Sequence, residues 1–150
     1  MANIRDALKQ VEAQAKGHER RSVIFLVGRT PGHLDGMVAV GKGSYLNELI
    51  ALAGGRNLMA DSVVAYPKIS LEGVVRLRPD VIIDMGDMAD TDAVPAGHLA
   101  QVRALYGKLP QVSAVKHGQV FAVASDIFVV PGPRVVEAAR EFERMIQGKP

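Results

Sequence analysis

The stretch from Val63 to Asp84, VVAYPKISLEGVVRLRPDVIID, constrains the fold more than any other part of the chain. Ser70 is expected to cap a short helix, because its hydroxyl can accept a hydrogen bond from a free amide of the first turn. Glu72 then lies in that first turn, where the helix dipole favours a carboxylate. Pro79 ends the helix, since the residue before a proline is disfavoured in helical dihedrals. The β-branched run 81–83 predicts a strand buried on both faces, so helix and strand follow one another as in α/β folds.

The rest of the chain continues this alternation. Apolar residues at three- and four-residue steps predict helices over residues 4–15, 45–53, 96–106 and 134–147. Short apolar runs predict strands over residues 22–27, 37–40, 81–83 and 119–123. The fold class predicted is therefore α/β, a three-layer, mostly parallel sheet flanked by helices. Ligands of such sheets bind beyond the carboxyl ends of the strands, here the loops that open at Gly28, Asp84 and Ala124.

Composition narrows the class of protein. A chain of 150 residues with 48% apolar content can build one domain with a core of its own. The net charge of +2 comes from scattered basic residues, which does not favour nucleic acid as a partner. There are no cysteines, so a disulfide framework and thiolate metal sites are excluded. No apolar run reaches the roughly 18 residues of a membrane span, and the charged amino-terminal residues are not expected to be a signal peptide.

A phosphate-binding loop is one alternative to weigh. The segment from Gly36 to Gly43, GMVAVGKG, followed by Ser44, is close to the pattern G-x(4)-G-K-[ST]. Gly43 stands where the pattern needs a hydroxyl for Mg²⁺, and Gly36 lies well beyond the end of the first strand at Gly28. The alternative is a small nucleotide- or phosphate-binding α/β protein that uses this GKGS loop, and we favour instead glycines that let the backbone turn into a helix capped by Ser44.

No catalytic or metal-binding pattern stands out elsewhere. The histidines lack the spacing of zinc-binding motifs, and the aspartates at 84, 87, 90 and 92 do not match a calcium loop and are expected to form a solvated acidic loop. No serine lies in a G-x-S-x-G elbow. The sequence therefore predicts a protein that is not an enzyme and needs neither a metal nor a cofactor.

Five short segments, in consistent order, resemble one family. They are GKGSYLNELIALAGGRN at 41–57, PKISLE at 67–72, RPDVII at 78–83, AVKHGQVF at 114–121 and PGPR at 131–134. Together they resemble the substrate-binding proteins of ABC importers for iron-siderophore complexes, haem and cobalamin, and the cobalamin-binding branch most. The resemblance covers residues 22–146.

That resemblance implies a two-lobe protein whose ligand lies between α/β lobes joined by a long helix. This chain is then the carboxyl-terminal lobe over residues 21–150, with residues 1–20 as the end of the linking helix and the amino-terminal lobe absent. The parent protein is expected to be periplasmic or lipid-anchored outside the cytoplasm. The apolar face left by the missing lobe is a possible surface for self-association.

The resemblance also assigns roles to residues. Glu72 occupies the position of the glutamate that docks on arginines of the membrane permease, although a carboxylate there can equally serve only the helix dipole. Tyr66 occupies the position of an aromatic residue against the bound corrinoid, with packing over the helix end as the alternative. The remaining ligand-binding candidates follow the first and last strands and are Arg29, Thr30, Asp126, Ile127 and Phe128. The alternatives are a place in the core for Phe128 and an ion pair with a nearby carboxylate for Arg29. The expected ligand is cobalamin, a ferric siderophore or haem.

Overall fold

A computed structural model describes residues 6, 9–13, 21–28, 35–42, 45–62, 64–85, 98–122 and 135–146. Residues 9–13 are helical. The further elements, in chain order, are β1 (Arg21–Gly28), β2 (Met37–Ala39), α2 (Tyr45–Leu52), β3 (Gly55–Asn57), β4 (Lys68–Ile69), α3 (Leu71–Leu77), β5 (Val81–Asp84), α4 (His98–Tyr106), α5 (Ser113–Lys116), β6 (Val120–Ala122) and α6 (Val135–Ile146).

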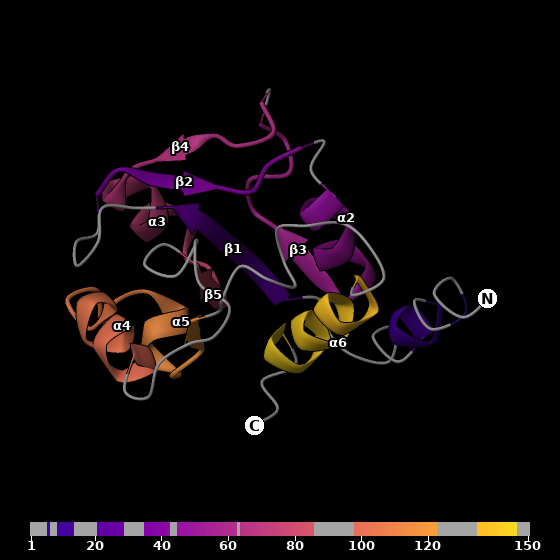
Figure 1. Cartoon of the computed structure of the whole chain (residues 1–150). Coiled ribbons are helices and arrows are strands. Elements are labelled where there is room, and N and C mark those ends of the chain that lie inside the picture. Colours follow the sequence, from indigo (N-terminus) through magenta and orange to yellow (C-terminus); the bar gives the residue numbers. More distant parts are fainter. Residues whose placement is uncertain are drawn as a thin grey trace.

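The strands form one sheet with β1 at its centre, in the order β4-β2-β1-β5-β6 (Figure 1). β1 is parallel to β5, and β5 is parallel to β6. The other edge of β1 is shared, since β3 pairs in parallel with its first half from Arg21 and β2 pairs antiparallel with its second half up to Gly28. β4 then pairs antiparallel with β2. A parallel centre thus carries an antiparallel margin on one side.

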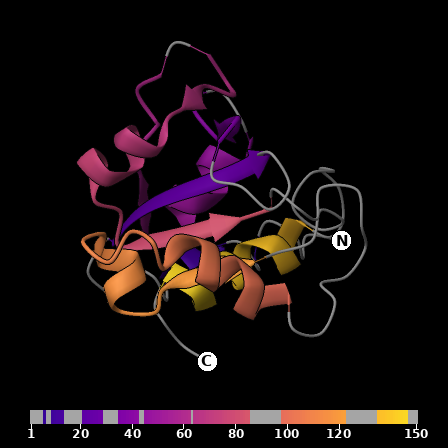
Figure 2. The same ribbon diagram turned by 90° about the vertical axis from the view of Figure 1, so that its left-hand side faces the viewer.

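Helices cover both faces of the sheet, as the alternating side chains of β1 require. Val23 and Phe25 belong to one apolar cluster with α2 and α6, and Ile24 and Leu26 belong to a second cluster with α3, α4 and α5. In Figure 1, α2 and α6 accordingly lie on one side of β1, and α3, α4 and α5 lie on the other. Figure 2 looks from the side of α3, α4 and α5, so that α4 and α5 lie in front of α6. The predicted three-layer α/β fold is confirmed.

Most predicted elements have the expected position. The strands around 22–27 and 81–83 and the helices that end near 53, 106 and 147 lie within one or two residues of their predictions. Three short elements were not predicted: β3, β4 and α5, of which α5 lies where a loop was expected. Of the helix predicted over residues 4–15, the structure describes residues 6 and 9–13, and these are helical. No described helix is both long enough and apolar enough to cross a bilayer.

Candidate functional site

The carboxyl ends of the parallel strands meet at one edge of the sheet, as predicted. Leu26 pairs with Asp84, and Asp84 pairs with Ala122, so β1, β5 and β6 all end at this edge. The predicted ligand-binding residues that follow these strands lie outside the described residues; they are Arg29, Thr30, Asp126, Ile127 and Phe128.

The two other predicted site residues, Tyr66 and Glu72, lie on one exposed strip at the antiparallel margin of the sheet. We call this strip the 64–72 ridge. From Val64 to Ser70 every second side chain is exposed, while the side chains between them are half-buried or buried. This is the alternation of an extended segment with one face on the protein. The ridge therefore presents a continuous row of side chains to solvent.

The ridge carries all the large hydrophobic side chains that are exposed in the described part of the chain. Val64 is 53% exposed, Tyr66 is 52% exposed and Leu71 is 37% exposed. Leu71 is thus exposed at the start of its helix, whereas Val74 of the same helix is only 1% exposed. The three exposed side chains lie along one strip, and large exposed apolar side chains are common at interaction surfaces.

Backbone hydrogen bonds fix the part of the ridge that bears Tyr66. The amide of Ala39 donates to the carbonyl of Pro67 at 2.8 Å, and the amide of Gly41 donates to the carbonyl of Ala65 at 2.7 Å. These bonds extend the antiparallel pairing of β2 with β4 toward the amino-terminal half of β1. Tyr66 thus lies at the outer margin of the sheet, two strands from β1.

Glu72 is positioned by the cap that the sequence predicted. Ser70 has extended backbone dihedrals, and its Oγ accepts a hydrogen bond from the amide of Gly73 at 3.0 Å. Helix α3 starts at Leu71, so Glu72 lies in its first turn with an exposed side chain. The helix ends at Leu77, where Arg78 adopts a left-handed conformation (φ 50°) directly before Pro79.

Residues 36–42, the described part of the candidate phosphate loop, do not have the geometry of such a loop. Three of the residues that would curl around a phosphate form strand β2, Met37–Ala39. The amides of Val40 and Gly41 donate to the carbonyls of Phe25 and Ala65, and the amide of Lys42 donates to Ser62 Oγ at 3.3 Å. A phosphate loop needs such amides for its ligand. Gly43 and Ser44 lie outside the described residues.

Asp84 corrects the prediction of a wholly solvated acidic loop. Its side chain is 1% exposed, and its Oδ2 accepts a hydrogen bond from the Tyr106 hydroxyl at 2.7 Å. The aspartates at 87, 90 and 92 lie outside the described residues. Among the residues described, no group of three or more His, Cys, Asp and Glu side chains could hold a metal ion.

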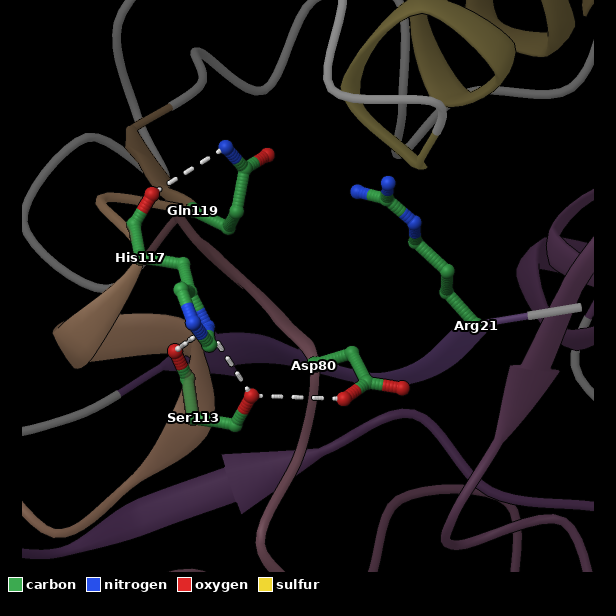
Figure 3. A pocket seen from close by; sticks show the side chains of 5 residues that line it. All are labelled: Arg21, Asp80, Ser113, His117 and Gln119. Carbon is green, nitrogen blue, oxygen red and sulfur yellow. Dashed lines mark hydrogen bonds between the residues drawn. The ribbon is translucent and has the colours of Figure 1, made fainter. Parts of the chain in front are cut away.

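A polar pocket that the sequence did not predict lies at the opposite edge of the sheet. It has a volume of about 440 Å³ and is lined by Arg21, Asp80, Ser113, His117 and Gln119 (Figure 3). Arg21 begins β1, while Asp80 and Gln119 directly precede β5 and β6. The sequence could have indicated this pocket only through the positions of these residues at the starts of predicted strands, because the starts of neighbouring parallel strands meet at one edge of a sheet.

Nearly the whole chain is similar in sequence to known proteins. The profile of a family described as periplasmic binding protein matches residues 1–127. Among curated relatives, the vitamin B12-binding protein of Vibrio cholerae is 28% identical over 139 residues, which are 93% of this chain and 45% of the relative. An uncharacterised ABC transporter substrate-binding lipoprotein of Bacillus subtilis is 26% identical over 147 residues, 96% of this chain and 42% of that protein.

A solved structure supports the fold independently. The structure described as an ABC-type Fe³⁺-hydroxamate transport system from Saccharomonospora viridis superposes with a TM-score of 0.78 at 24% identity, over 96% of this chain and 47% of the other. At that identity the likeness shows the fold alone. This chain spans less than half the length of the curated relatives that it matches.

Proposed function

Because this chain belongs to the periplasmic binding protein family, we propose that it forms one lobe of the substrate-binding component of an ABC importer. The lobe is the carboxyl-terminal one, and residues 1–20 continue the helix that links it to an amino-terminal lobe. Its place of action is outside the cytoplasmic membrane. Its role is non-covalent capture and delivery of a ligand, without turnover.

The ligand we propose is a large metal chelate, with cobalamin first and a ferric siderophore or haem next. The match with a vitamin B12-binding protein supports this order. Tyr66 would contribute a flat, rigid apolar surface of the kind that suits a macrocycle. Arg29, Thr30, Asp126, Ile127 and Phe128 would face the same ligand from the loops after β1 and β6.

The observation that carries the proposal is the 64–72 ridge, which combines exposed apolar side chains with a directed carboxylate. Glu72 is exposed beside Leu71, and the Ser70 cap fixes the start of its helix. A carboxylate held in this way suits a docking contact with arginines of the permease. A charge at the rim of an interface contributes chiefly to encounter and orientation.

The ligand half of the proposal is tested by following the amide NMR spectrum of the ¹⁵N-labelled chain during separate titrations with cyanocobalamin, haemin, ferrichrome and Mg-ATP. We expect one chelate to shift the amides of Tyr66 and its neighbours, and Tyr66→Ala to weaken that binding by roughly tenfold. Tyr66→Phe keeps the ring and is expected to bind as the wild type does. A response to Mg-ATP alone would contradict the receptor function.

The docking half needs a separate measurement with matched carboxylates. The parent receptor, with both lobes, is bound to its permease in nanodiscs, and Glu72→Ala is compared with Glu48→Ala. Both glutamates are exposed in the first turn of a helix, α3 and α2 respectively. We expect Glu72→Ala alone to slow association, with less salt dependence than the wild type. Equal association rates for the two variants would remove Glu72 from the interface.

A further inference from the structure

We propose that the polar pocket at the amino ends of β1, β5 and β6 binds a small zwitterion that carries a carboxylate and an ammonium group, such as a free amino acid. This site lies at the opposite end of the strands from the edge where the chelate is expected. With four residues in β5 and about 3.3 Å per residue, the two edges are separated by at least about 13 Å.

The first element of the site is the Arg21 guanidinium, which has no partner among the described residues. Arg21 is half-buried at the start of β1, and its side chain extends across the pocket (Figure 3). Within the described part of the chain, no ion pair or hydrogen bond of its guanidinium is found, and none joins it to Asp80. A guanidinium has several donors in a planar fork that matches a carboxylate in geometry.

The second element is the Asp80 carboxylate, which hydrogen bonds with Ser22 and Ser113 hold in place. Asp80 Oδ2 accepts the amide of Ser22 at 3.2 Å, and the amide of Asp80 donates to Ser22 Oγ at 2.9 Å. Ser113 Oγ donates to Oδ1 at a longer 3.4 Å. A carboxylate can accept about four hydrogen bonds, so Asp80 keeps acceptor capacity for an ammonium group on the ligand.

The third element is an amide whose hydrogen bonds are incomplete. Gln119 Nε2 donates to the carbonyl of His117 at 3.3 Å. Its Oε1 is shielded from solvent and has no hydrogen-bond partner among the groups described. Figure 3 shows this amide and the Arg21 guanidinium facing one another across the pocket. A shielded acceptor without a donor is costly, and a rotation of the amide into the pocket would let a ligand N–H group satisfy it.

Ser113, His117 and Asp80 are also the residue types of a hydrolytic triad, but their geometry disfavours that role. Ser113 Oγ contacts both Asp80 Oδ1 and, at 3.3 Å, His117 Nδ1, so the hydroxyl lies between the carboxylate and the imidazole. In a Ser-His-Asp triad the imidazole lies in the middle, where the carboxylate orients it as a base. The opposite charges of Arg21 and Asp80 in a pocket of about 440 Å³ instead indicate binding of a ligand with two charges.

The test uses the ¹⁵N-labelled chain and the standard L-amino acids, each added singly at millimolar concentration. We expect at least one of them to shift the amides of Arg21, Ser22, Asp80 and Gln119 in a saturable way. Its N-acetyl and carboxamide derivatives each lack one charge and are expected to bind at least about tenfold more weakly, since each loses a charge-assisted hydrogen bond.

Variants decide whether the pocket is responsible. Arg21→Gln and Asp80→Asn are each expected to weaken binding about tenfold or more. Arg56→Gln and Asp61→Asn remove exposed charges outside the pocket and are expected to leave binding unchanged. If Asp80→Asn fails to fold, Arg21→Gln decides alone. The proposal is overturned if no amino acid gives saturable shifts, if the derivatives bind equally well, or if Arg21→Gln binds like the wild type.

Discussion

The hydroxyl of Tyr106 ties helix α4 to the carboxyl end of β5 through a residue that would otherwise be costly to bury. The Tyr106 side chain is fully buried and donates to Asp84 Oδ2 at 2.7 Å. Burial of a carboxylate is tolerated only when its oxygens accept hydrogen bonds. This bond therefore stabilises the strand end that leads into the expected ligand edge.

Tyr106→Phe is expected to lower the free energy of unfolding by about 1–3 kcal/mol, because it removes a donor from a buried acceptor. Urea denaturation followed by circular dichroism measures the change. Tyr66→Phe is the matched control, because the Tyr66 side chain is 52% exposed and its loss of a hydroxyl should leave stability unchanged. Equal midpoints for Tyr106→Phe and the wild type would contradict this role of the hydrogen bond.

Gly41 permits the close approach of the ridge to the sheet. A Cβ atom at this position would lie 2.1 Å from Ser62 Oγ, 2.7 Å from the Val64 carbonyl oxygen and 2.8 Å from Pro67 Cδ. The serine side chain could rotate away, but the carbonyl and the proline ring belong to the ridge itself. Any larger residue must therefore displace the segment that bears Tyr66.

Gly41→Ala is expected to destabilise the protein by about 1–3 kcal/mol, the usual cost of overpacking, and to shift the amide resonances of residues 64–67. Thermal unfolding and NMR measure the two effects. Gly28→Ala is the control, because a Cβ atom there meets nothing within 4 Å. Unchanged ridge resonances in Gly41→Ala would show that the close approach is not needed.

At the scale of elements, the short helix α3 depends on its cap. It has only seven residues and one fully buried side chain, Val74. Helices this short are marginal without tertiary contacts or capping. The bond from the Gly73 amide to Ser70 Oγ thus has a larger share in the stability of α3 than it would in a long helix.

Ser70→Ala is expected to cost about 1 kcal/mol of stability, while Ser70→Asp should retain most of it, because aspartate is an equally good cap. Chemical denaturation of both variants against the wild type provides the comparison. Hydrogen exchange of the Gly73 amide should accelerate in Ser70→Ala only. Equal exchange in both variants would indicate that water satisfies this amide as well as the side chain does.

The elements that could be predicted from the sequence are those that local residue patterns stabilise, and the elements that depend on tertiary contacts could not be predicted. β1 and β5 consist largely of β-branched and aromatic residues, and α3 begins with a capping residue, so local signals predicted them. β3 is Gly55–Asn57, and glycine and asparagine are depleted in strands. It is a strand because it pairs with Arg21–Val23, a tertiary contact that no local pattern contains.

The same distinction applies to the sites. The position of Glu72 in the first turn of α3 could be predicted, because the cap and the carboxylate are neighbours in sequence. Arg21, Asp80 and Gln119, in contrast, meet only through the pairing of β1, β5 and β6.

At the scale of the whole molecule, the two apolar clusters are coupled through the central strands. Val81 and Ile83 of β5 belong to the cluster of α2 and α6, and Ile82 between them belongs to the cluster of α3, α4 and α5. When packing is lost on one face of the sheet, the central strands become less ordered, and the helices packed on the other face then lose their support as well. Unfolding should therefore be a single cooperative transition, as is usual for domains of this size.

Phe142 on α6 provides the test, because its ring packs edge-to-face on Phe25 with centroids 5.5 Å apart. Phe142→Ala is expected to cost about 3–5 kcal/mol, and Phe142→Leu is a milder variant in case the first does not fold. In a Tyr45→Phe/Tyr66→Phe background, the tyrosine fluorescence comes from Tyr106 alone, which lies in the opposite cluster, and circular dichroism reports all helices. Both signals should shift to the same lower midpoint, because β1 and β5 transmit the loss of packing across the sheet. Two separated transitions would instead mean that each face of the sheet folds with its own helices.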